Sequence, residues 1–225
     1  MNMNIKINNR LQKISDFIIG EDRVIDIGCD HGLLGIYLVI NKNIKKMVSS
    51  DLNQLPLNKA KENLLNYDLI NKIELRLGDG LECVSNDLDT VIISGMGGET
   101  INEILKDINK YPNIKKIVVS PNTDFSKTRK IISKLGFYLD KEDLVYEKKK
   151  YYLVSCYIKG KSKKIDYRFG KLNLSNEIVI NYYKELVSTN KKIINNLTRK
   201  NLLKKIKLNW ENYLILRKFK DLMED

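Results

Sequence analysis

Short apolar stretches alternate with helix-length amphipathic segments through the first two thirds of the chain, and this alternation constrains the fold more than any other feature. The stretches expected to be strands are 24–27, 47–51, 73–77, 90–94 and 117–120. The segments expected to be helices are 8–19, 33–40, 56–67, 99–110 and 126–135. Strands that alternate with helices predict βαβ units, and therefore an α/β fold built on a parallel sheet.

Two further stretches, 137–146 and 151–158, flank the basic turn Lys148-Lys149-Lys150 without a helix between them. We therefore expect them to pair as antiparallel strands at one edge of the sheet. A plain dinucleotide-binding domain is not expected to end in such an antiparallel strand pair. Five parallel-type strands followed by a closing hairpin are typical of a Rossmann-like, seven-stranded class I methyltransferase sheet.

The remainder of the chain is predicted to be helical. A basic connector over 160–170 leads into residues 171–225, where apolar residues recur at helical spacing and a turn is expected near 198–201. This pattern predicts an antiparallel coiled-coil hairpin, and thus two domains, 1–160 and 161–225. The expected seam consists of Val179, Tyr182, Leu186, Ile193 and Leu197 on one helix and Leu203, Ile206, Trp210, Tyr213 and Arg217 on the other. The aromatic residues among them could instead be platforms on which bases stack.

Positive charge is concentrated at the C-terminal end. The chain has a formal net charge of +12, of which +3 lies in residues 1–160 and +9 in residues 161–225. Abundant Lys, Asn and Ile also suggest a compositional bias, but bias alone would not gather the charge at one end. We therefore expect a polyanionic partner for the hairpin.

Several classes of protein are disfavoured. No apolar run is long enough for a membrane-spanning helix, and the N-terminus lacks the apolar region of a signal peptide. Cys29, Cys83 and Cys156 form no C-x-x-C pair, which argues against a disulfide framework and against a zinc site. We expect a cytoplasmic protein that needs no metal.

The loop Asp26-Ile27-Gly28-Cys29-Asp30-His31-Gly32 lies between the first strand and the first helix of the sheet domain, where parallel sheets bind ligands. It is not the G-x-G-x-x-G fingerprint, and Asp30 would repel a pyrophosphate at the helix N-terminus. A ligand with a cationic end fits better. S-adenosylmethionine (SAM) carries an ammonium and a sulfonium, for which Asp26 and Asp30 are candidate partners.

Two more carboxylates stand at the carboxyl ends of the next two expected strands. Asp51 is placed to accept hydrogen bonds from ribose hydroxyls, or else to cap the following helix. Asp79, in Gly78-Asp79-Gly80, is placed to accept from an adenine amino group, or else forms a simple turn.

The fourth and fifth strands end in Ser94-Gly95-Met96-Gly97-Gly98 and Ser120-Pro121-Asn122. Met96 could pack on a base or belong to the core. Asn122 could bind an adenine edge or merely form a turn. The sole histidine, His31, is either a general base or, as we favour, a residue that caps the helix or touches the methyl donor.

These motifs resemble the TrmK-type bacterial tRNA (adenine-22-N1)-methyltransferase family over nearly the whole chain. The residues that carry the resemblance are the Arg10-Leu11 helix, the 26–31 loop, Gly78-Asp79-Gly80, the 94–98 loop, Pro121-Asn122 and Phe169-Gly170. The resemblance implies a SAM-dependent domain with a C-terminal coiled coil that methylates N1 of adenine 22 in tRNA. Cys29 stands where the family usually has Ser or Thr, and Lys171 where it often has Pro.

Strand-end position and this resemblance together give the expected site. The cofactor-binding set is Arg10, Asp26, Gly28, Cys29, Asp30, His31, Asp51, Leu52, Asp79, Gly80, Ser94, Gly95 and Met96. The expected catalytic residues are Asp30, Asn122 and Met96, and the expected tRNA-binding residues are Lys191, Lys192, Arg199, Lys200, Lys204, Lys205 and Lys207. We expect a monomer that binds SAM, releases S-adenosylhomocysteine and acts on tRNA. Methylation of another RNA adenine or a protein amine, a non-catalytic SAM-sensing RNA-binding protein and a nicotinamide-dependent enzyme are the alternatives.

Overall fold

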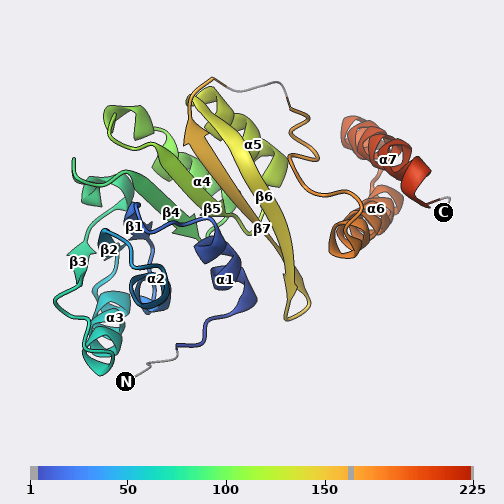
Figure 1. Cartoon of the computed structure of the whole chain (residues 1–225). Helices are drawn as coiled ribbons and strands as arrows, with labels where there is room; N and C mark the ends of the chain where they lie inside the picture. Colours follow the sequence, from blue (N-terminus) through green and yellow to red (C-terminus); the bar gives the residue numbers. More distant parts are fainter. Residues whose placement is uncertain (1–4, 162–164, 224–225) are drawn as a thin grey trace. The chain divides into compact units, whose positions relative to one another are not determined.

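The computed structural model describes residues 5–161 and 165–223, and the chain divides into two compact units between Lys171 and Leu172. The first unit is built on one seven-stranded sheet (Figure 1). Its strands are β1 (Arg23–Ile27), β2 (Lys46–Asp51), β3 (Ile73–Leu77), β4 (Thr90–Ser94), β5 (Lys116–Ser120), β6 (Phe137–Glu147) and β7 (Lys150–Lys159). Their order is β3-β2-β1-β4-β5-β7-β6. The first five strands are parallel, whereas β7 pairs antiparallel with both β5 and β6, so the expected methyltransferase sheet is confirmed.

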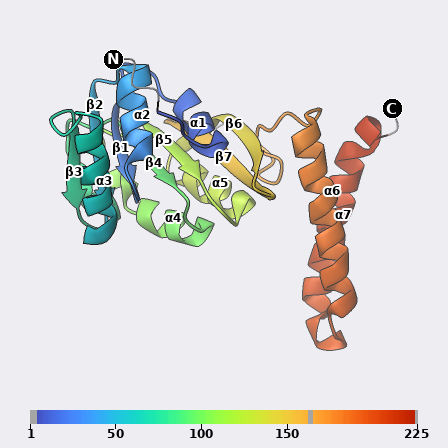
Figure 2. The ribbon, with the colours of Figure 1, turned by 90° about the horizontal axis from the view of Figure 1, so that it is seen from below.

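Helices cover both faces of the sheet (Figure 2). They are α1 (Asn9–Asp16), α2 (Leu33–Lys42), α3 (Gln54–Asn66), α4 (Gly98–Leu105) and α5 (Phe125–Lys134), with short 3-10 turns η1 (Gly80–Cys83) and η2 (Ile108–Lys110). Alternate residues of each strand enter opposite core layers, as the two-residue period of a strand requires. Val24 packs with residues of α1, α2 and α3, while Ile25 packs with residues of α4 and α5.

The helix expected over 8–19 ends at Asp16, and two other boundaries differ from the sequence pattern in informative ways. The helix expected over 99–110 ends at Leu105, and its last residues form the separate turn η2. The turn between β6 and β7 contains only Lys148 and Lys149, both at positive φ, so Lys150 already belongs to β7. A two-residue turn of this handedness matches the twist of paired strands and allows both to extend further than expected.

The described end of the basic connector, residues 165–170, packs on the sheet unit, although the sequence pattern groups it with the hairpin. A buried ion pair joins Arg129 Nε to Glu142 Oε1 at 2.8 Å. Arg129 Nη1 donates to the carbonyls of Tyr167 and Arg168, and the Lys171 N–H donates to Glu142 Oε2 at 3.0 Å. These bonds fix residues 167–171 on α5 and β6.

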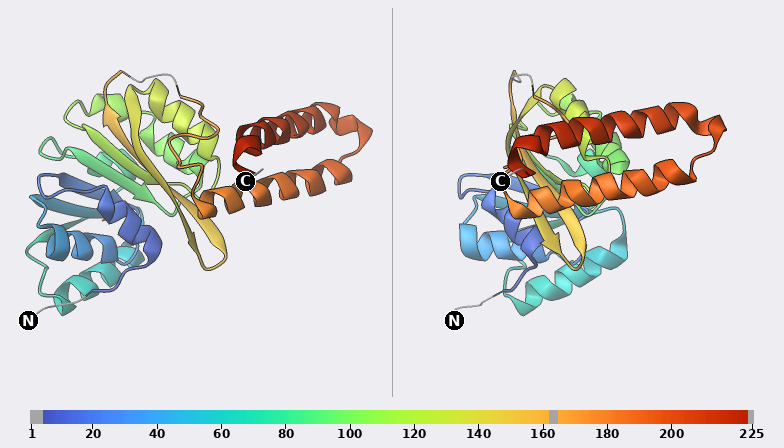
Figure 3. Two further views of the ribbon diagram at one scale, coloured as in Figure 1. Left: turned by 45° about the vertical axis from the view of Figure 1, so that its right-hand side comes forward. Right: turned by 90° about the vertical axis from the view of Figure 1, so that its right-hand side faces the viewer.

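The second unit is an antiparallel pair of helices, α6 (Glu177–Asn196) and α7 (Leu202–Met223), joined through the 3-10 turn η3 (Arg199–Asn201) (Figure 3). The hairpin and its turn are as predicted, but the seam is not. Among the side chains that the structure describes, the buried residues are Val179, Tyr183, Val187, Asn190 and Ile194 on α6 and Asn212, Ile215 and Phe219 on α7. Of the expected seam only Val179 is among them.

The error on α7 has a physical cause. This helix carries apolar residues on two opposite faces, and both have the spacing of a coiled-coil seam. The hairpin closes through the face that contains Asn212, whose Oδ1 accepts a 3.0 Å hydrogen bond from Asn190 Nδ2. A buried, paired amide fixes helix register at some cost in stability. The face selected from the sequence points outward.

Candidate functional site

The loop after β1 is held against the neighbouring strand by its backbone. The N–H groups of Gly28 and Cys29 both donate to the Ser50 carbonyl, at 2.8 and 2.9 Å. Gly28 adopts a φ of +75°, and a Cβ there would lie 2.2 Å from Met96 Cε. The left-handed conformation at this position favours glycine, and a larger residue would also require the flexible Met96 side chain to move.

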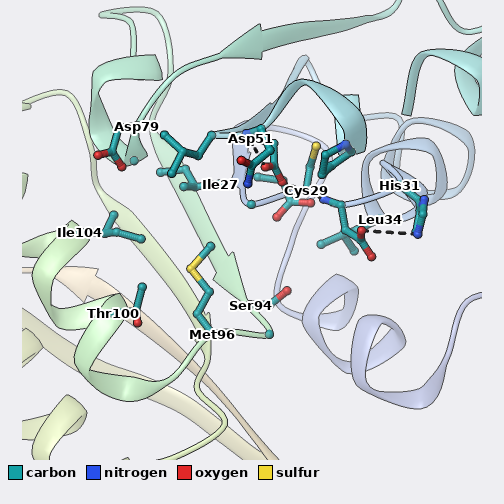
Figure 4. A pocket seen from close by; sticks show the side chains of 18 of the residues that line it. Ile27, Cys29, His31, Leu34, Asp51, Asp79, Ser94, Met96, Thr100 and Ile104 are labelled. Atoms are coloured by element: carbon teal, nitrogen blue, oxygen red, sulfur yellow. Dashed lines mark hydrogen bonds and ion pairs between the residues drawn. The ribbon is translucent and has the colours of Figure 1, made fainter. Parts of the chain in front are cut away.

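This loop borders a cavity of about 980 Å³ at the carboxyl ends of the parallel strands. Every residue expected to bind the cofactor lines it: Arg10, Asp26, Gly28, Cys29, Asp30, His31, Asp51, Leu52, Asp79, Gly80, Ser94, Gly95 and Met96. Figure 4 shows Asp51, Asp79 and Met96 directed towards this cavity from different elements. The parallel topology brings them together, because equivalent strand ends meet at one edge of the sheet.

The cavity is strongly acidic. Among the described residues, six carboxylate side chains line it, against only Arg10 and His31 as groups able to carry positive charge. Asp26 is buried, and its Oδ1 has no hydrogen-bond partner within the described residues. Burial, reinforced by the Asp51 carboxylate, raises the pKa of Asp26 to about 7, while Arg10 acts in the opposite direction. An unpartnered buried carboxylate oxygen favours a cationic ligand group.

Neither Asp51 nor Asp79 uses its carboxylate to cap the helix that follows it. Asp51 Oδ1 accepts from the Asn53 N–H at 2.9 Å, and its Oδ2 from the Asp30 N–H at 3.4 Å. The N-cap of α3 is Asn53, so Asp51 does not fill that role. Asp79 precedes η1 and makes no side-chain cap hydrogen bond. Both carboxylates therefore present acceptor capacity to the cavity.

His31 lies beside Asp30 at the solvent-exposed rim. Its Nε2 is 3.4 Å from Asp30 Oδ1, and both side chains are exposed. The His31 carbonyl accepts a hydrogen bond from Asn63 Nδ2 at 2.9 Å. Cys29 is buried, and burial together with the carboxylates of Asp26 and Asp51 raises the pKa of its thiol. Cys29 thus lacks the thiolate character of a nucleophile.

Asn122 lies just after β5, as expected, and contacts the Gly-rich loop after β4. It is exposed and is not among the residues that line the cavity. Its Nδ2 donates to the Gly95 carbonyl at 2.7 Å, and its backbone N–H donates to the Met96 carbonyl at 2.8 Å. Asn122 therefore ties the loop after β5 to the loop that carries Met96.

Helix α4 forms a wall of the cavity that the sequence pattern did not indicate. The residues that line the cavity beyond the expected set are Leu11, Ile27, Leu33, Leu34, Asn53, Pro56, Gly78, Glu99, Thr100, Glu103 and Ile104. The sequence did contain one indication of this wall. Helix α4 begins directly after the Gly-rich loop, so its first residues lie at the same edge of the sheet as the cavity. Glu99 and Glu103 are also paired with Lys127 and Lys106.

Most of the basic residues expected to bind tRNA are at the surface of the hairpin. Lys191, Lys192, Lys200, Lys204 and Lys207 are exposed, whereas Lys205 is half-buried. The side chain of Arg199 lies outside the described residues. No ion pair engages the exposed lysines within the described part of the chain. They are available to a polyanion.

Within residues 5–161 and 165–223, no helix combines the length and apolar character needed to cross a membrane. The same residues contain no cluster of three or more His, Cys, Asp or Glu side chains able to hold a metal ion.

Comparisons with known proteins agree with this geometry. Residues 7–155 match the family model described as a methyltransferase domain. The chain is 30% identical over 152 residues to the Bacillus subtilis tRNA (adenine(22)-N(1))-methyltransferase. That match covers 67% of this chain and 64% of the B. subtilis protein, a little under two thirds of it.

Solved structures resemble the chain over nearly its full length. M. capricolum TrmK, solved in complex with S-adenosylhomocysteine, is 30% identical with a TM-score of 0.84, covering 96% of this chain and 98% of that one. B. subtilis TrmK shares the fold at 24% identity with a TM-score of 0.82, covering 95% and 99%. The resemblance indicated by the strand-end motifs is thereby confirmed.

Proposed function

This chain belongs to the methyltransferase domain family, and from that premise we propose that it transfers the methyl group of SAM to N1 of adenine 22 in tRNA. The observation that carries the proposal is the acidic cavity with its unpartnered Asp26 Oδ1. The names of the B. subtilis and M. capricolum relatives supply the acceptor, and the S-adenosylhomocysteine complex of the latter supports the donor.

The residues of the cavity fit SAM. Asp26 and Asp30 offer carboxylates to its cationic end, and Asp51 offers acceptors for ribose hydroxyls. Asp79 is placed to accept from the adenine amino group. The shortage of cationic groups on the walls also disfavours a pyrophosphate-containing nicotinamide cofactor.

Bound SAM supplies an electrophilic methyl group, which the lone pair of adenine N1 attacks in line. The N–CH₃ bond forms as the S–CH₃ bond breaks, and S-adenosylhomocysteine is the leaving group. Adenine N1 is unprotonated at neutral pH, so no strong general base is needed for this step. The chain contributes positioning, which can lower a barrier by up to about 7–11 kcal/mol in well-oriented reactions. The methylated base is cationic, and a neighbouring carboxylate stabilises the charge that develops on it.

We assign that role to Asp30, which is exposed on the cavity wall. Met96 lines the cavity, and the end of its side chain lies beside Gly28. From that position it packs against the base or shapes the cavity that receives it. Asn122 acts as a positioning residue that holds the Gly95-Met96 loop through its amide, a role supported by its contacts with both residues.

Binding of the tRNA backbone is assigned to the basic hairpin. Lys191, Lys192, Lys200, Lys204 and Lys207 would contact phosphates, which gives affinity without sequence preference. The acidic cavity repels phosphates, so the target adenine must enter as a single extruded base. We further propose that the enzyme is a monomer and acts in the cytoplasm.

The decisive experiment is a methyl-transfer assay with SAM and unmodified tRNA transcripts that differ only by A or G at position 22. A methyl group on N1 blocks Watson–Crick pairing, so the product appears as a reverse-transcription stop. We expect a stop at position 22 in the A transcript alone. A stop elsewhere would identify another RNA adenine as the acceptor. Absence of any stop while SAM still binds would favour a protein acceptor or a non-catalytic, SAM-sensing RNA-binding protein.

A further inference from the structure

Helix α7 exposes an apolar face that points away from α6. Its members are Leu203, Ile206, Trp210 and Tyr213, which we call the aromatic face; they are 84%, 56%, 59% and 50% exposed, respectively. They recur at intervals of three and four residues, whereas the buried positions Asn212, Ile215 and Phe219 occupy the opposite side of the helix. A contiguous exposed apolar strip on a helix indicates an interaction surface.

The two aromatic rings at its centre are already arranged for stacking. The rings of Trp210 and Tyr213 have centroids 5.3 Å apart and an interplanar angle of 27°. Both side chains remain at least half exposed, so the stacked pair offers ring surface to a further planar group. Aromatic side chains that project from a basic surface are the usual platforms for unpaired bases.

The charge around the aromatic face indicates which planar group it would take. Residues 202–220 contain six basic side chains and one acidic side chain. Lys204 and Lys207 are exposed within one or two turns of Trp210, and Arg217 lies one turn beyond Tyr213. Within the described residues these three cations form no ion pair. Apolar contact surface bordered by unpaired cations complements a nucleic-acid strand that has unstacked bases.

We propose that the aromatic face is a base-stacking platform: an unpaired base of the bound tRNA stacks on Trp210, while Lys204, Lys207 and Arg217 contact the adjacent phosphates. This inference rests on the proposed tRNA substrate and adds that the hairpin binds unpaired nucleotides as well as the charged backbone. A second copy of the chain is the less suitable occupant, because it would bring two strongly basic helices together.

Trp210 is the only tryptophan of the chain, so its fluorescence reports on this surface alone. The full-length protein is titrated with three probes: an unmodified tRNA transcript, single-stranded oligoadenylate and a fully paired RNA duplex. Stacking of a base on the indole quenches its emission. We expect saturable quenching by the tRNA and by oligoadenylate, and little quenching by the duplex even where the duplex binds.

Variants separate stacking from charge. Trp210→Ala should weaken tRNA binding about 5- to 150-fold without changing the salt dependence, since the loss of a stacked base removes no phosphate contact. Trp210→Phe should retain most of the affinity. Lys204→Ala/Lys207→Ala should instead lower the slope of log affinity against log salt by about 2. Ile193→Ala, on α6, is the matched control for the loss of a partly exposed apolar side chain.

Three results would overturn the proposal. The first is unchanged tRNA affinity in Trp210→Ala, and the second is unchanged Trp210 emission in saturating tRNA. The third is a doubled molar mass, accompanied by a shift in Trp210 emission, when protein concentration is raised in the absence of RNA. The last result would assign the face to self-association. If the position-22 assay fails while oligoadenylate still quenches Trp210, the acceptor assignment is wrong but the stacking platform stands. Unchanged SAM binding in every variant shows that the sheet unit is intact.

Discussion

The buried carboxyl of Asp26 should make SAM binding depend on pH near neutrality. Its pKa is raised to about 7 by burial and by the Asp51 carboxylate, so much of the ligand-free protein carries a neutral Asp26 at pH 6. A cationic ligand group favours the ionised form. If SAM requires that form, the ionisation of Asp26 by itself should raise SAM affinity about eightfold between pH 6 and pH 7.5.

The assay is a titration of SAM by calorimetry or equilibrium dialysis at several pH values over this range. The upper limit keeps the ligand's own ammonium mostly charged, because α-amino groups titrate near pH 7.7–8.0. Asp26→Asn, which is nearly isosteric and does not titrate, is the matched control and should bind SAM weakly with a flat profile. Parallel profiles for both proteins would refute the contact between Asp26 and the cationic end.

The same group predicts an opposite trend in the stability of the ligand-free protein. Between about pH 4 and pH 7 the folded state keeps a proton on Asp26 that the unfolded state has already released. The contribution of this group to stability is therefore fully present below about pH 4 and is lost as pH rises through about 7. Denaturant unfolding should show Asp26→Asn gaining stability relative to the parent between pH 5 and pH 8.

Three further substitutions test other parts of the structure. Asp30→Ala should lower kcat by about 10²–10³-fold, as expected for a group that stabilises developing charge, and should change SAM affinity much less; equal losses in both would make Asp30 a donor-binding residue. Gly28→Ala introduces a Cβ at a φ of +75° and in contact with Met96 Cε. It should weaken SAM binding and add about 1–3 kcal/mol of backbone strain to the folded state. Unchanged SAM binding and unchanged unfolding would contradict the close approach assigned to this position. Arg129→Leu leaves Glu142 buried without its ion-pair partner, and urea unfolding should show the sheet unit destabilised by about 3–5 kcal/mol. A loss below about 1 kcal/mol would show that the ion pair is dispensable.

Much of the candidate site was predictable because parallel topology converts sequence order into spatial proximity. Once β1, β2 and β3 were identified, Asp26, Asp51 and Asp79 had to meet at one edge of the sheet. The wall formed by α4 was not predictable in the same way. Its first turns contact the cavity only because of the direction in which the helix leaves the loop after β4, and side-chain periodicity does not specify that direction.

Asn122 illustrates a related limit. Its place after β5 correctly put it near the rim, but a short polar side chain can hydrogen-bond to backbone or to ligand with equal chemical ease. In the structure its Nδ2 donates to the Gly95 carbonyl at 2.7 Å, a contact that the sequence does not specify. The raised pKa of Asp26 likewise depends on burial and on the nearby Asp51 carboxylate.

The sequence by itself determined the alternation of strands and helices, the closing hairpin of the sheet, the strand-end carboxylates and the existence of a basic helical hairpin, because each is encoded by local period or by order along the chain. Tertiary structure decided which face of α7 closes against α6. Local periodicity measures how apolar a face is, and α7 has two such faces; only packing against the partner helix selects Asn212, Ile215 and Phe219 and leaves Trp210 exposed.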